Sequence, residues 1–177
     1  EEERQGDYYR LLTEYQQKRL RLCWEIGYRD GEGNSLMLCG QTRGVYLGDY
    51  DGAMERLDGA LQILGDTPVE MYVLLRVMQI EALRGNFEPA LEALERAQRI
   101  GEQAVFATAR AGLRLGVIML YNALGDEDHL RAAKDMISEL HEMLEENPLL
   151  THQYEIALAC EATALHLGLT ALASGQE

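Results

Sequence analysis

The feature that most constrains the fold of this chain is a stretch of sixteen residues that occurs twice. Gly48–Ile63 reads GDYDGAMERLDGALQI and Gly85–Ile100 reads GNFEPALEALERAQRI. The copies start 37 residues apart (85 − 48), and a fixed period of that size marks a repeat architecture. Both copies share a glycine, an Asp or Asn, an aromatic residue and then apolar positions at Ala53/Ala90, Met54/Leu91, Leu57/Leu94, Ala60/Ala97 and Ile63/Ile100.

The first residues of each copy predict a turn between two helices. Gly48 and Gly85 would end one helix in a backbone conformation that a β-carbon disfavours. Asp49 and Asn86 follow, where a side-chain oxygen can cap the next helix. Each copy therefore predicts a helical hairpin.

The apolar positions of each copy predict how neighbouring hairpins pack. Ala53 and Ala60 are seven residues apart on one helix face, so a neighbouring helix can approach closely, and Leu57 fills the seam between them. Because only the next hairpin can cover this face, the unit must stack. Ala90, Leu94 and Ala97 repeat the arrangement.

The pattern is helical throughout, because no run alternates apolar and polar residues as a strand would. On the first helix we expect Leu11, Leu12, Tyr15, Leu22 and Ile26 to face the core. We expect Pro68 and Pro148 to fall between helices. The eight predicted helices cover residues 7–26, 32–46, 50–64, 69–84, 87–101, 102–124, 127–146 and 151–173.

The glycine–acid–aromatic turn followed by alanines and a large apolar residue resembles the tetratricopeptide repeat family. A third copy starts at Gly125, 40 residues after Gly85 (125 − 85), and both spacings exceed the 34 residues usual in that family. Such long helices resemble the variants found in large bacterial signalling ATPases and transcription activators. The third copy continues with Asp126, Leu130, Ala133 and Ile137, and the family's Leu-Gly pair corresponds to Cys39-Gly40 and Leu115-Gly116.

The resemblance implies an all-α fold, a right-handed α-α superhelix of about three and a half hairpins. We expect a single repeat domain over residues 1–177 that is a fragment of a larger protein, because the chain begins with Glu1. Its parts would be an orphan helix of a truncated repeat (1–29), three hairpins (30–66, 67–101 and 102–146) and a terminal helix (150–173).

The net charge, the cysteines and the absence of catalytic motifs exclude several classes of function for this sequence. The net charge of −14 would repel a phosphate backbone or an anionic membrane surface, so we expect no direct nucleic-acid binding and no membrane binding. Cys23, Cys39 and Cys160 have no disulfide or metal spacing, which favours buried thiols in a reducing, cytoplasmic compartment. No catalytic motif or histidine pair at metal-ligand spacing occurs, so we expect no enzyme activity, no metal and no cofactor.

In tetratricopeptide stacks the first helix of each hairpin lines a concave groove. That resemblance implies an interaction module that binds a peptide or protein partner there, and arginines in the groove would favour an acidic partner. The alternative is an effector-sensing domain of a multidomain bacterial transcription or signalling regulator. A further expectation is self-association through the stack ends, since the final helix is apolar around much of its circumference. The implied groove residues are Asn34, Met37, Gln41, Tyr72, Leu75, Arg76, Gln79, Arg110, Leu113 and Arg114, of which the polar and aromatic members are the candidate site.

Overall fold

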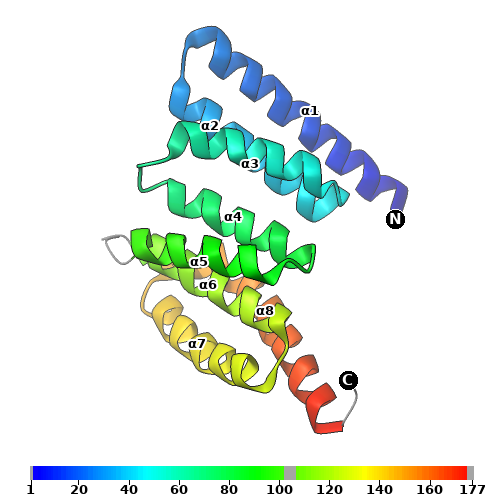
Figure 1. Ribbon diagram of the computed structural model, residues 1–177, viewed down its shortest axis with the longest axis vertical. Helices are drawn as coiled ribbons and strands as arrows, with labels where there is room; N and C mark the ends of the chain where they lie inside the picture. The colour runs from blue at the N-terminus through cyan, green and yellow to red at the C-terminus, as the bar shows by residue number, and fades with distance from the viewer. Residues whose placement is uncertain (1, 102–106, 175–177) are drawn as a thin grey trace. The chain divides into compact units, whose positions relative to one another are not determined.

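Short turns separate successive helices within the described ranges, in close agreement with the helices predicted from the sequence. The computed structural model describes residues 2–101 and 107–174, and within these ranges the fold is all-α. The predicted bounds of the two repeated helices are confirmed, whereas the first five residues of the predicted helix 102–124 lie outside the described ranges. The elements are α1 (Glu2–Ile26), α2 (Arg29–Gln41), a π-helical turn η1 (Thr42–Tyr46), α3 (Tyr50–Leu64), α4 (Glu70–Leu83), α5 (Phe87–Gly101), α6 (Ala107–Leu124), α7 (Glu127–Glu145) and α8 (Pro148–Ser174) (Figure 1).

The turn glycines adopt the predicted left-handed conformation. Gly48 has φ +68°, Gly85 has φ +79°, and Gly125 at the third copy has φ +74°. At Gly85 the backbone N–H donates to the carbonyl of Ala82 (3.0 Å), and the next N–H, of Asn86, donates to the carbonyl five residues back (2.9 Å). This pair of hydrogen bonds is the Schellman motif that closes a helix C-terminus.

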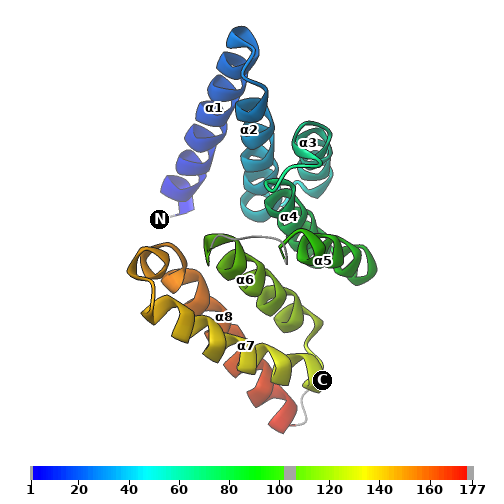
Figure 2. The same ribbon diagram turned by 90° about the vertical axis from the view of Figure 1, so that its left-hand side faces the viewer.

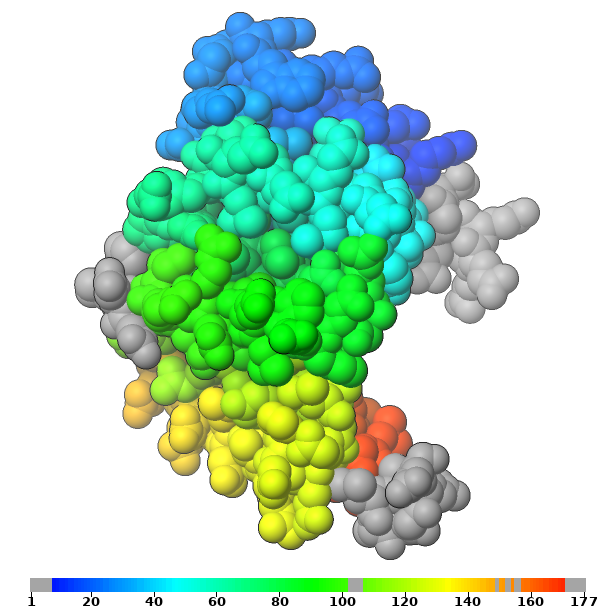
Figure 3. All heavy atoms as spheres, viewed as in Figure 1, coloured from blue at the N-terminus to red at the C-terminus, as the bar shows by residue number. Residues whose placement is uncertain are grey.

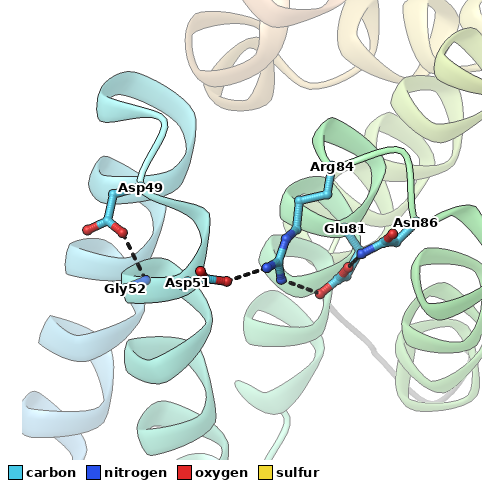
Figure 4. Close-up of polar contacts among 6 residues, drawn as sticks. All are labelled: Asp49, Asp51, Gly52, Glu81, Arg84 and Asn86. Carbon is cyan, nitrogen blue, oxygen red and sulfur yellow. Dashed lines mark hydrogen bonds and ion pairs between the residues drawn. The ribbon is translucent and has the colours of Figure 1, made fainter.

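Polar side chains fix the same turns (Figure 4). Asp49 caps α3 as predicted, since its Oδ1 accepts from the backbone N–H of Gly52 (3.0 Å). The side chain of Asn86, at the corresponding position of the second copy, donates from Nδ2 to Glu81 Oε2 (2.7 Å). Arg84, the C-cap residue of α4, forms ion pairs with Glu81 of α4 and with Asp51 of α3, so this side chain links the end of α4 to α3 (Figure 4).

The chain divides into two units, Glu1–Ala93 and Leu94–Glu177. In the first unit α2 packs against α1, α3 and α4, and α3 packs against α4 (Figures 1 and 2). Glycines allow this close packing: a β-carbon on Gly40 would lie 3.0 Å from the carbonyl oxygen of Ala53. The predicted seam is confirmed, because Ala53, Leu57 and Ala60 are fully buried in one core cluster.

The predicted core face of α1 is wrong. Leu11, Tyr15, Leu22 and Ile26 are more than half exposed and Leu12 is only partly buried, whereas from Tyr8 onward the buried residues of α1 are Gln16, Leu20 and Cys23. Among the described residues the backbone of α1 comes close only to α2 and η1, and its buried Leu20 joins the core cluster of the first unit, so a single side of this helix is buried. The wider apolar stripe of α1 remains on the surface.

The second unit is built from α6, α7 and α8, which pack pairwise against one another. The Asn122 side chain on α6 donates to both the backbone and the carboxylate of Glu161 on α8 (3.0 and 2.8 Å). Pro148 does not lie between helices as predicted but is the first residue of α8, a position where its missing N–H costs nothing. The core cluster of this unit includes Ala111, Leu115, Ile118, Leu130, Ala133, Leu140, Leu144, Leu150, Tyr154, Leu158 and Leu165.

Across the described residues we find no helix with the length and apolar character needed to cross a membrane.

Candidate functional site

The accessible side of α4 carries three of the predicted site residues. Seven residues of this helix are buried, and they surround most of its circumference. Tyr72, Arg76 and Gln79 are partly exposed and have i, i+4, i+7 spacing, so they share one face. Arg76 Nη1 donates to Gln79 Oε1 (3.1 Å). Leu75, which the family spacing also assigned to the groove, is buried instead.

A second row of accessible residues runs along α2. Asn34, Met37 and Gln41 are partly exposed and have i, i+3, i+7 spacing. The Asn34 Nδ2 donates to the backbone carbonyl of Asp30 (2.9 Å), which fixes the orientation of the amide. Because α2 contacts α4 within the first unit, the two rows lie on neighbouring helices.

The remaining predicted site residues, Arg110 and Arg114, lie on α6 in the second unit. Arg110 is exposed, whereas Arg114 is partly buried and forms an ion pair with Glu139 on α7 (Nε to Oε2, 3.6 Å). The sequence predicted that these two arginines converge with Arg76. Arg76 belongs to the first unit, so the convergence of the three arginines stays a prediction.

A pocket of about 170 Å³ lies in the first unit, on the side where α1 and α3 meet the end of α2. Six of its residues come from α1, one from α2, one from η1 and one from α3. Side chains of α1 (blue) and α3 (cyan) form much of the upper part of the face in Figure 3. The lining residues are Thr13, Gln16, Gln17, Leu20, Arg21, Trp24, Cys39, Arg43 and Arg56.

Three arginines line this pocket, each from a different element. Arg43 of η1 is oriented by Asp49, whose Oδ2 accepts from the Nε of Arg43 (2.7 Å). Arg21 is exposed and Arg56 is partly buried, and neither has an ion-pair partner among the described residues. The pocket therefore concentrates positive charge within a chain whose net charge is −14.

Two further side chains give the pocket its chemistry. The buried Gln16 donates from Nε2 to Thr42 Oγ1 of η1 (2.9 Å), while its Oε1 has no hydrogen-bond partner within the described part of the chain. Burial raises the pKa of the Cys39 thiol, and the charges of Arg56 and Arg43 act in the opposite direction. Both guanidinium groups therefore lie close enough to Cys39 to favour its thiolate form.

Sequence reasoning missed this pocket because its cations do not form a motif. Arg21, Arg43 and Arg56 are far apart in the chain and share no spacing. The π-helical turn that contributes Arg43 and Thr42 was predicted as ordinary helix. Such turns are frequent at functional sites, but no sequence pattern used above predicts them.

Within the described ranges no group of three or more His, Cys, Asp or Glu side chains could hold a metal ion. No family model, no curated protein and no solved structure matches this chain.

Proposed function

We propose that this segment is a non-catalytic interaction module that binds a peptide or protein partner along the accessible faces of α2 and α4. The observation that supports this role is the composition of the α4 face. On a helix buried over most of its circumference, the accessible residues include a tyrosine, an arginine and a glutamine. Tyrosine and arginine are enriched among the residues that contribute most to binding energy at interfaces.

The chemistry of this face favours an extended or helical segment with acidic side chains. Arg76 offers a planar fork to a carboxylate, and Asn34, Gln41 and Gln79 offer amides to backbone groups. The acidity of the remaining chain would discriminate against acidic segments that lack the matching contacts. In the proposed architecture, a tetratricopeptide-like superhelix, α2 and α4 are first helices of successive hairpins.

A peptide-display selection against the whole chain tests this role. We expect enriched sequences to be acidic and to lose at least tenfold in affinity for the variant Tyr72→Ala/Arg76→Glu, because truncating such residues commonly costs about 2 kcal/mol or more. Arg99→Glu, which makes the same charge change at an exposed position on α5, serves as the control. Enriched peptides that bind the double variant as tightly as the wild type would refute the assignment.

A second candidate function is an effector-sensing domain of a cytoplasmic bacterial regulator, and the arginine-lined pocket favours it. The pocket includes Cys39 of α2, which is not part of the accessible row on that helix. A small ligand and a peptide could therefore bind the first unit together. Self-association through a stack end is compatible with both functions, and on α8 the exposed Leu167 is a candidate contact for it.

A further inference from the structure

We propose that the pocket bounded by α1, η1 and α3 binds a small organic acid, with its carboxylate or phosphate group held by Arg21 and Arg56. This inference rests on the second candidate function and names the ligand class. It does not depend on the peptide-binding role of α2 and α4.

The arginines supply the charge for this recognition. Arg21 and Arg56 come from separate helices and line one pocket without an ion-pair partner among the described residues. Arg43 is already paired with Asp49, which offsets its positive charge, so the recognition of an anion rests on Arg21 and Arg56. Guanidinium groups bind carboxylate and phosphate oxygens through paired N–H donors, and such charge-assisted hydrogen bonds are stronger than neutral ones.

The volume of the pocket and its remaining lining residues indicate what the uncharged part of the ligand is. A cavity of about 150 Å³ accommodates a benzene ring, and this pocket measures about 170 Å³. Leu20 and Trp24 offer apolar surface for a ring or a short carbon skeleton. The Oε1 of the buried Gln16 accepts no hydrogen bond from the described residues. A ligand hydroxyl or amine that donates to it would remove the cost of leaving this acceptor unpaired.

The position of the pocket suggests how ligand binding would affect the stability of the first unit. Its walls belong to α1, α2, η1 and α3, and the Gln16–Thr42 hydrogen bond joins α1 to η1 beside it. An oxyanion held between Arg21 of α1 and Arg56 of α3 would add a polar link between these two helices. A bound acid is therefore expected to stabilise the first unit against unfolding.

The test uses the whole chain and three probes: 4-hydroxybenzoate, phenyl phosphate and the neutral 4-hydroxybenzamide. Binding is measured by isothermal titration calorimetry and by the fluorescence of Trp24, the single tryptophan of the chain, which lines the pocket. We expect one or both anions to bind and the amide to bind at least tenfold more weakly. Comparing the two anions distinguishes a carboxylate site from a phosphate site.

The variant Arg21→Gln/Arg56→Gln should weaken anion binding by at least tenfold, because each change removes a charge-assisted contact. Lys18→Gln is the matched control, since it removes an exposed positive charge from α1 outside the pocket. Equal binding of the amide, undiminished binding to the double variant, or no heat and no fluorescence change up to about 10 mM would each overturn the proposal. An acid that binds without altering peptide affinity would leave this site in place and remove the sensing role.

Discussion

Replacing Gly85 tests whether backbone conformation, and not space, sets the residue at the repeat turns. Gly85 has φ +79°, and a β-carbon there would meet no atom within 4 Å. The cost of Gly85→Ala is therefore the left-handed conformation alone, about 1–2 kcal/mol. For a chain of this length that cost lowers the melting temperature by roughly 2–8 °C.

Gly85→Asn should cost less than Gly85→Ala, although asparagine is larger. Asparagine tolerates the left-handed region because its side chain can hydrogen-bond locally. Thermal unfolding is followed by far-UV circular dichroism and by the fluorescence of Trp24, which reports on the first unit.

Gly44 provides the opposite case within the same unit. A β-carbon there would lie 2.1 Å from Ile80 Cδ1 and 3.0 Å from the β-carbon of Ala53, and Ile80 is fully buried. Here the larger asparagine should cost more than alanine, whose overpacking costs about 1–3 kcal/mol. If alanine and asparagine rank in the same order of stability at both positions, the distinction between a glycine required by its φ angle (Gly85) and one required by lack of space (Gly44) is refuted.

Three other predictions follow from the electrostatics. The side chain of Arg43 and the backbone N–H of Gly52 donate hydrogen bonds to Asp49 and hold its pKa below the ordinary value of 3.8. The stabilisation of the folded state by these bonds is therefore complete above pH 3.8 and is lost as the pH falls through the lowered pKa. In Asp49→Asn the melting temperature should depend less on pH in the acid range. Because burial raises the pKa of Cys39, iodoacetamide should modify the exposed Cys160 before Cys39 at neutral pH, and mass spectrometry should show the modification of Cys39 accelerating as the pH is raised. Arg114→Gln should lower the free energy of unfolding by less than about 1 kcal/mol, because its ion pair with Glu139 is partly exposed; a larger loss in chemical denaturation would show that this arginine is structural.

The repeated elements were predictable because local chemistry specifies them. A left-handed glycine and a capping aspartate fix where α3 begins, so its bounds follow from the sequence. The seam of Ala53, Leu57 and Ala60 was equally predictable, since small residues seven apart fit a close helix pair.

The face of α1 was not predictable in the same way. Its apolar residues suggested a buried stripe, but a helix with neighbours on one side buries only the residues that those neighbours touch. Gln16 is buried because Thr42 of η1 accepts its hydrogen bond, a contact across 26 residues that no local pattern encodes. The pocket depends on the same long-range geometry.

The proposed partner surface is tested most directly by nuclear magnetic resonance of the ¹⁵N-labelled chain, titrated with the tightest peptide from the display selection. We expect the largest amide shifts on α2 and α4, around Asn34, Gln41, Tyr72, Arg76 and Gln79. Shifts confined to α1, α3 or the second unit, with α2 and α4 unchanged, would contradict this expectation.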